Sequence, residues 1–255
     1  MILDRTNIVV PELCPIQFTE PSELTFYPDQ QRYLPKVIGG TRIQIFISET
    51  WYDSTDTIWC ELIDVNDNVI ASVDAVKAEL SEGYWYATFT FSNITDSELA
   101  YFSIKRNGIE AAYSVWYQLN PEYDSDIKRI EYNHSENDYN FVFDATNYFI
   151  DVECGFKPED IRIEEEAEDF LEQDLVNETV YGDQYEVLPL TIGDNLGIPA
   201  WMAVKVARAL KCDTVIIDGT EYKRTTGAKI EKGEMTYNGL NSYKIDLQKT
   251  NNYIQ

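Results

Sequence analysis

The stretch ELAYFSIKRNGIEAAYSVWYQL, residues 98–119, decides the fold class. It consists of two runs rich in aromatic and β-branched residues, which favour pleated strands, on either side of Asn107-Gly108. That dipeptide accepts the positive φ angles that a two-residue turn demands. We therefore predict an antiparallel hairpin over these residues.

Similar runs lie upstream of this hairpin. TRIQIFIS (41–48) alternates isoleucine with polar residues, TIWCELID (57–64) ends before a tight turn at 66–68, and YWYATFTF (84–91) follows. Short alternating strands separated by turns, without a helical period, are typical of an immunoglobulin-like β-sandwich. We predict such a sandwich over residues 41–119.

The segment before the predicted sandwich is rich in proline. Each proline fixes its own φ angle and restricts the preceding residue, so a long helix is excluded there. The residues concerned are Pro11, Pro15, Pro21, Pro28 and Pro35. We predict an extended N-terminal arm over residues 1–40 that becomes ordered on assembly.

The second half of the chain, 120–255, is predicted to be an α+β domain with one main helix. A polar stretch at 120–126 marks the domain boundary, and strands are expected at IKRIEYN (127–133), YNFVF (139–143) and YFIDVEC (148–154). Pro199 favours a helix start, and Met202, Val206 and Leu210 form an apolar stripe over about 198–210. The predicted fold class is therefore mainly β, with an N-terminal sandwich followed by this α+β domain.

The charge of the chain excludes nucleic-acid clamping. The sequence has 45 acidic and 20 basic residues, a formal net charge of -25. Affinity for phosphates comes from clustered Lys and Arg, so we expect no sequence-specific nucleic-acid binding. A repulsive passage through which DNA slides remains compatible with this charge.

Membrane insertion and thiol or metal chemistry are not expected either. No run of 18 apolar residues exists, and the N-terminus lacks a basic region followed by an apolar core, so we expect a protein made in a cytoplasm. The four cysteines lie far apart and are predicted to be reduced and buried. They are Cys14, Cys60, Cys154 and Cys212.

Local motifs predict neither a cofactor, a metal nor a catalytic residue. The segment 193–197 precedes the helix but lacks the G-K-S/T of a phosphate loop, so we interpret it as a turn. His134, the single histidine, lies in a turn between strands. Glu164, Glu165 and Glu166 lack the loop of a calcium site.

Two alternatives use other residues. Asp151 and Glu153 alternate along one expected strand and share a face, which permits a hydrolase with paired carboxylates. Trp85 and Trp116 lie on aromatic strands that could display a sugar-stacking platform. The second alternative is a carbohydrate-binding or adhesive β-sandwich module.

The second half also resembles a known group of proteins. The succession IKRIEYNHSENDYNFVF, GFKPEDIRIEEEAEDFLEQDLVNETVY, LTIGDNLGIPAWMAVKVARALKCDTVIIDGTEYKR and YKIDLQK is similar to virion structural proteins of tailed phages and prophages of Bacteroidetes, including the crAss-like group. The resemblance covers roughly residues 127–250. It implies a non-enzymatic subunit of a homo-oligomeric ring or tail barrel around the DNA channel, between portal and tail.

A closed ring needs a heterologous interface, in which one patch of a subunit meets a different patch of the next. The helix carries a basic, aromatic edge, and the stretch 159–174 holds nine acids against one arginine. We predict that these two surfaces meet. The candidate interface residues are Trp201, Lys205 and Arg208 on one side and Glu164, Glu165, Glu166 and Asp169 on the other.

Overall fold

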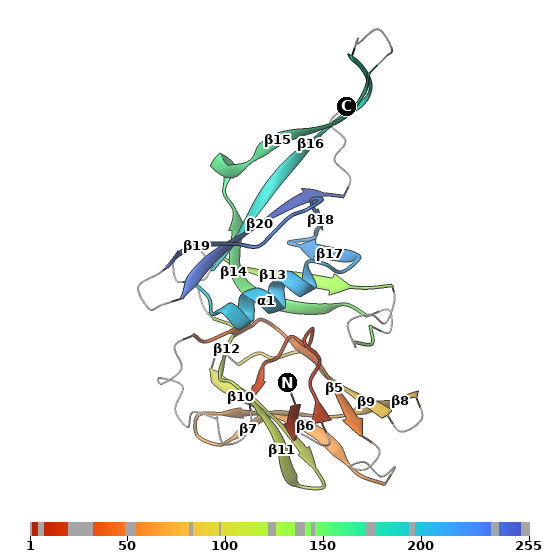
Figure 1. Ribbon diagram of the computed structural model, residues 1–255. Helices are drawn as coiled ribbons and strands as arrows, with labels where there is room; N and C mark the ends of the chain where they lie inside the picture. Colours follow the sequence, from red (N-terminus) through yellow and green to blue (C-terminus); the bar gives the residue numbers. More distant parts are fainter. Residues whose placement is uncertain are drawn as a thin grey trace. The chain divides into compact units, whose positions relative to one another are not determined.

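The chain is mainly β, with two sheets and a single α-helix in the part that the structure describes. This computed structural model describes residues 2–4, 8–19, 33–48, 55–81, 84–96, 98–121, 126–135, 141–143, 146–171, 177–193, 197–235 and 240–250. The chain divides into two compact units, 1–152 and 153–255 (Figure 1). This division lies inside a strand, whereas the sequence suggested a boundary at 120–126.

Unit 1 contains two sets of paired strands. The first has the strand order β1-β2-β5-β9-β8. In the second, β10 pairs with β6, β11 and β12. The other pairs of this second set are β6 with β7, β11 with β3, and β4 with β12 and β14. The strands are β1 (Ile2–Asp4), β2 (Ile8–Val9), β3 (Phe18–Thr19), β4 (Lys36–Val37), β5 (Thr41–Ser48), β6 (Ile58–Asp64), β7 (Val69–Asp74), β8 (Val76–Ser81), β9 (Tyr84–Phe91), β10 (Leu99–Arg106), β11 (Ile109–Ser114), β12 (Tyr117–Leu119), β13 (Ile127–Asn133) and β14 (Tyr148–Phe156).

The predicted hairpin is confirmed. β10 and β11 pair antiparallel with Arg106 opposite Ile109, and the two turn residues have positive φ angles, 50° at Asn107 and 83° at Gly108. The strands predicted at 41–48, 57–64 and 84–91 are β5, β6 and β9. The predicted strands 127–133 and 148–154 correspond to β13 and β14, whereas Phe141–Phe143 are irregular.

The core of unit 1 lies between its strand sets. The alternate positions Ile43, Ile45 and Ile47 of β5 are at most 1% exposed, as the period of two predicted. Phe91 of β9 and Phe102 of β10 pack edge to face with ring centroids 5.3 Å apart, which joins the two sets. Apolar alternation therefore decides which faces of the strands meet.

The proline-rich N-terminal segment contributes to this core. Leu13, Ile16 and Phe18 are buried, the Tyr132 hydroxyl donates a hydrogen bond to the Leu13 carbonyl, and the Gln17 N–H donates to the Tyr117 hydroxyl at 2.8 Å. Residues 8–19 and 33–40 thus belong to unit 1, and not to a separate arm. The prolines prevent a helix, but extended backbone still fills the interior.

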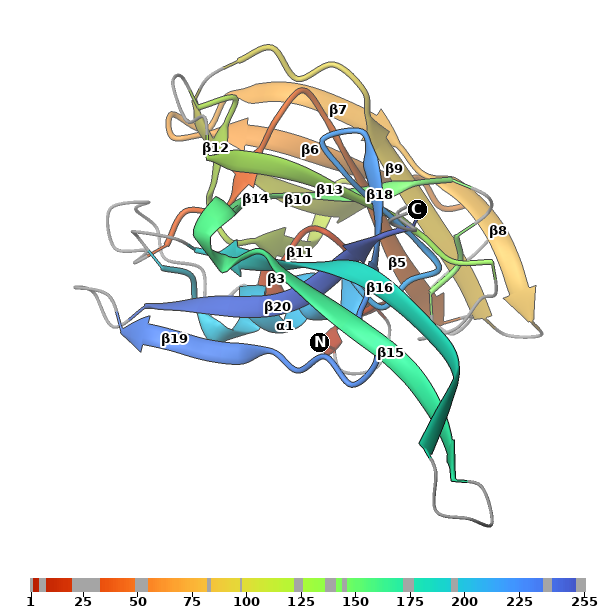
Figure 2. The same cartoon turned by 90° about the horizontal axis from the view of Figure 1, so that it is seen from above.

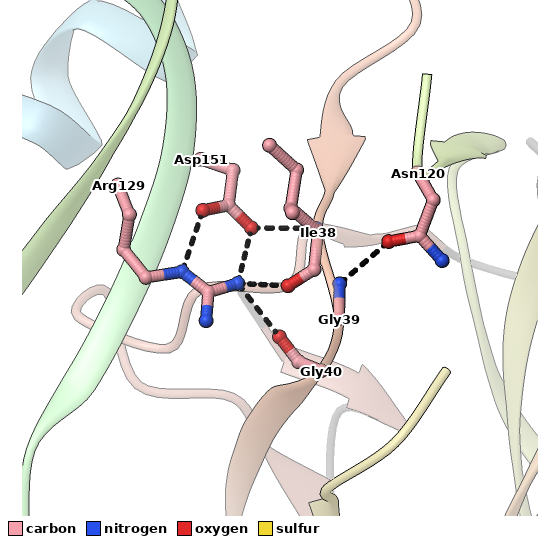
Figure 3. Close-up of polar contacts among 6 residues, drawn as sticks. All are labelled: Ile38, Gly39, Gly40, Asn120, Arg129 and Asp151. Carbon is pink, nitrogen blue, oxygen red and sulfur yellow. Dashed lines mark hydrogen bonds and ion pairs between the residues drawn. The ribbon is translucent and has the colours of Figure 1, made fainter. Parts of the chain in front are cut away.

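A buried ion pair holds the entry to β5 in place (Figure 3). Arg129 of β13 donates from Nε to one oxygen of Asp151 on β14 and from a terminal nitrogen to the other, each at 2.8 Å. Asp151 also accepts the Ile38 N–H at 2.8 Å, while the same guanidinium donates to the carbonyls of Ile38 and Gly40. The hydrogen bonds that Arg129 donates to Asp151 raise the pKa of Arg129 above its ordinary value.

Asn120 completes this junction from the end of β12. Its side-chain oxygen accepts the Gly39 N–H at 2.6 Å, and its amide group donates to the carbonyls of Ile94 and Asp96. At the next residue, a Cβ on Gly40 would lie 2.3 Å from the Phe91 carbonyl oxygen. Only glycine permits this close approach of two backbones.

Unit 2 is one sheet with the helix beside it. The sheet has the order β15-β16-β20-β18-β17, β19 pairs with β20, and the end of β14 pairs with β16. The elements are η3 (Pro158–Asp160), β15 (Arg162–Leu171), β16 (Asn177–Ile192), α1 (Ala200–Ala209), β17 (Thr214–Ile217), β18 (Thr220–Arg224), β19 (Glu231–Met235) and β20 (Asn241–Lys249). The predicted helix is confirmed, with Pro199 at its N-cap and Met202 and Val206 buried.

Within unit 2, β15 and β16 form a long two-stranded ribbon that extends beyond the other strands of the sheet (Figures 1 and 2). Residues 162–171 pair with 177–187, and only the last part of β16, from Leu188 to Ile192, also pairs with β20. Most of the acidic stretch 159–174 therefore forms β15, one of the two strands of this ribbon.

We expect Asp151→Asn to destabilise unit 1 by about 2 kcal/mol, because it leaves the guanidinium of Arg129 partly buried without its counter-charge. Urea unfolding followed by circular dichroism measures this loss. Asp160→Asn, which breaks the more exposed Lys244 ion pair, is the matched control and should cost about 0.5 kcal/mol or less. Equal losses in the two variants would contradict the structural role of Asp151.

Acid stability should depend on the turn between β6 and β7. Hydrogen bonds from the Asn68 side chain and backbone, and from the Asn66 N–H, lower the pKa of Asp64. A lowered folded-state pKa contributes stability above the unfolded value, about 3.9, that is lost as pH falls through the folded value. The free energy of unfolding should therefore fall less steeply below about pH 5 in Asp64→Asn than in the unmodified chain or in Asp74→Asn.

Candidate functional site

An open, charged groove of about 440 Å³ lies on one face of the sheet of unit 2. Strands β15, β16, β19 and β20 and the loop 225–229 supply its walls. Its lining residues are Asp160, Arg162, Glu164, Pro189, Thr225, Thr226, Gly227, Ala228, Lys229, Glu231, Lys244 and Asp246. Four acids and three bases occur among them, so the groove is far less acidic than the chain as a whole.

Arg162 links two strands across the groove. Its Nε donates to Glu164 Oε1 at 2.8 Å on the same strand, and its terminal nitrogen forms an ion pair with Asp246 on β20. The hydrogen bond that Arg162 donates to Glu164 raises the pKa of Arg162. The side chains of Arg162 and Glu164 are 46% and 41% exposed, so these ions remain accessible to a partner.

The other groove charges differ in their pairing. Lys244 Nζ lies 2.6 Å from Asp160 Oδ2, whereas Lys229 and Glu231 are exposed at the beginning of β19. The alternation of SYKIDLQK places Lys244 and Asp246 on one face of β20, a signal that was available in the sequence. Their position beside Arg162 follows only from the pairing of β20 with β16.

The lining of the groove is polar and charged, with two threonines, three bases and four acids. No histidine, cysteine, serine or tyrosine occurs in its lining. Across the described residues, no group of three or more His, Cys, Asp or Glu is placed to hold a metal ion. Opposite charges lie side by side on this open sheet face, at Arg162 and Asp246 and at Lys244 and Asp160.

One residue of the predicted basic edge of the helix, Lys205, is buried and not exposed as expected. Lys205 is only 5% exposed, whereas Trp201 and Arg208 are half-buried and Val204 is 48% exposed. Lys205 is therefore buried together with the apolar stripe of the helix, and not exposed on its edge. Of the acidic partners, Glu164 lines the groove, and the side chains of Glu165, Glu166 and Asp169 lie outside the described residues.

Most of the residues on which the hydrolase and carbohydrate-binding alternatives depend are buried. Asp151 is 4% exposed and bound to Arg129, and Glu153 is 6% exposed. Trp116 is 4% exposed and packs on Tyr101 with ring centroids 4.9 Å apart; burial raises the pKa of Tyr101 to about 12. Trp85 is half-buried. Neither a carboxylate pair nor Trp116 is open to a sugar.

The remaining sequence predictions concern single residues. All four cysteines are free and buried, as predicted, and burial raises the pKa of the Cys60 thiol well above its ordinary value. His134 lies directly after β13 with its ring 6.1 Å from that of Phe143. The Gly197 N–H donates to the Gly193 carbonyl at 2.5 Å, while 194–196 lie outside the described residues.

Comparison with known proteins adds no relative. No protein-family model, curated protein or solved structure matches the chain. Among the described helices, none has the length and hydropathy that a membrane span requires.

Lys205→Glu should destabilise unit 2 by about 2 kcal/mol or more, since it places an anion at a buried position whose surroundings accommodate a cation. The neighbouring change Arg208→Glu, at a half-buried position, should cost less than about 1 kcal/mol. Thermal unfolding of the two variants measures the difference. A similar loss in both would show that Lys205 is as tolerant as a surface residue.

Proposed function

We propose that this chain is a non-enzymatic phage virion protein, a subunit of a multi-copy ring of the neck or tail around the DNA channel. In this proposal unit 1 is an immunoglobulin-like sandwich, and unit 2 is an α+β assembly domain that contacts the next copy. The observation that carries it is the ribbon of β15 and β16, which extends beyond the sheet of its own unit.

The ribbon supports assembly because most of its length lacks a third strand among the described residues. Over residues 162–171 and 177–187 each strand pairs only with the other among the described strands. An isolated two-stranded ribbon is marginally stable in water, and a third strand or a packed surface is needed to stabilise it. A neighbouring subunit is the partner that a ring supplies at every position.

The charge of the chain supports a position beside DNA without tight binding. A net charge of -25 repels a polyanion, so DNA passing a lumen lined by such subunits would not be trapped. The proposed partners are other copies of the chain and the adjoining portal, ring or tail proteins. The proposed location is the virion, after synthesis in the bacterial cytoplasm.

The oligomeric state tests this proposal directly. We expect the purified full chain to form closed rings of one defined copy number, seen by native mass spectrometry and by electron microscopy of negatively stained particles. Detection of the chain in purified virions by mass spectrometry is the second requirement. A chain that stays monomeric at every concentration and is absent from particles would refute the proposal.

Shortening the ribbon tests the observation on which the proposal depends. Glu166 and Asp183 are opposite each other, so residues 167–182 can be replaced by an Asn-Gly turn that closes a shorter hairpin. We expect this variant to retain the thermal unfolding of both units but to form rings more weakly, because the outer part of the ribbon no longer meets the neighbouring copy. The matched control, Asp74→Lys with Glu79→Lys, changes exposed charges of unit 1 and should leave the rings intact.

A further inference from the structure

Unit 2 has two open sheet edges that are complementary to each other. Strands β15, β16, β20 and β19 follow one another in the sheet, so β15 and β19 are its edges in this part. Among the described residues, β15 pairs only with β16, and β19 only with β20. Unpaired N–H and C=O groups on an edge strand are a template for pairing with another chain.

The two edges carry matching tripeptides. Arg162-Ile163-Glu164 begins β15, and Lys229-Ile230-Glu231 leads into β19. Written antiparallel, Lys229 faces Glu164, Ile230 faces Ile163, and Glu231 faces Arg162. Opposite charges and apolar side chains are the cross-strand pairs that stabilise a sheet.

The exposure of these residues agrees with a role in docking. Ile163 is 65% exposed and the adjacent Ile161 is 37% exposed, which is unusual for isoleucine on a strand. Lys229 and Glu231 are exposed as well. In each tripeptide the two charged residues line the charged groove, so both edges present their ions to the same face of the sheet.

We propose that the start of β15 of one copy adds to residues 229–231 of the next copy, where β19 begins, in this register, so that the sheet continues from subunit to subunit. This inference rests on the proposed multi-copy assembly and names its interface. The strands β15, β16, β20 and β19 alternate in direction, because each neighbouring pair is antiparallel. An even number of alternating strands means that a next copy in the same orientation presents β15 antiparallel to β19, as the charge pattern requires.

The main rival is pairing of β15 with a second β15. Arg162-Ile163-Glu164 is complementary to itself, so its charge pattern also permits this two-fold contact. Beyond the tripeptides either register reaches residues outside the strands, the 3-10 helix Pro158–Asp160 and the turn at Gly227, so charges there do not separate the two arrangements. The heterologous contact propagates, whereas the two-fold contact stops at a dimer.

Charge swaps separate these arrangements. Lys229→Glu with Glu231→Lys should raise the protein concentration for half-maximal assembly by about tenfold or more, because two attractive rungs become repulsive. Arg162→Glu with Glu164→Arg should do the same. The chain that carries all four changes restores opposite charges at both rungs and should regain most of the assembly.

The matched control is Glu221→Lys with Lys223→Glu, a swap of the same spacing on β18, which is paired on both sides. It should not change assembly. Native mass spectrometry measures oligomer size, and thermal unfolding confirms that each variant is folded. A Glu164 to Lys229 crosslink between copies, made with a zero-length carbodiimide reagent, is expected in the unmodified protein.

The outcomes distinguish the two proposals. Rings that form normally in both double variants would overturn the edge pairing and leave the ring function standing. Dimers that survive Arg162→Glu with Glu164→Arg would identify the self-complementary pairing and also overturn it. A chain that never assembles would overturn both proposals together.

Discussion

The bidentate pair between Arg129 and Asp151 is the interaction on which the order of unit 1 depends. It joins β13 to β14 and binds both backbone groups of Ile38, so the chain enters β5 in one defined position. A carboxylate that is 4% exposed is costly unless its charge is neutralised and its oxygens are bonded, and here both conditions are met. Asn120 and the close approach of Gly40 to Phe91 add restraints that depend on that position. Asp151 thus has a structural role, in which both of its carboxylate oxygens accept hydrogen bonds.

Unit 2 is organised around a different constraint, the unequal lengths of its strands. β16 has sixteen residues, but β20 covers only five of them, and β15 covers most of the rest. Where this ribbon begins, Ile161 and Ile163 are exposed, and they lie beside charged residues whose side chains are more than one-third exposed. Exposed isoleucines and unpaired edges are liabilities for a solitary protein, because they invite association. In a subunit of a ring they are the means of association.

The sequence predicted where the strands lie better than it predicted which strands pair with each other. Period-two alternation identified β5, β6, β9, β10 and β14, and Asn107-Gly108 identified the hairpin, because these signals are local. The apolar stripe of the helix is buried as predicted. Lys205 was expected on an exposed edge, however, and it is buried too. A lysine can bury its aliphatic stem wherever the neighbouring strands leave space, and the helix alone does not reveal where that space lies. Trp116 was considered for a sugar-stacking platform, but it is buried. Its contact with Tyr101 arises from the pairing of β10 with its neighbours, which the local sequence does not reveal.

The amino-acid sequence by itself determined the mainly β character, the single helix, the reduced buried cysteines and the large negative charge, since all of these follow from residue type and short-range pattern. Only the tertiary structure decided that residues 8–19 lie in the core, that the division between units falls after Val152, and that Arg162 meets Asp246 across a groove. Each of these depends on contacts between segments far apart in the chain. Strand order and register select those contacts, and many pairings of similar strands satisfy the same local pattern until the whole interior is packed.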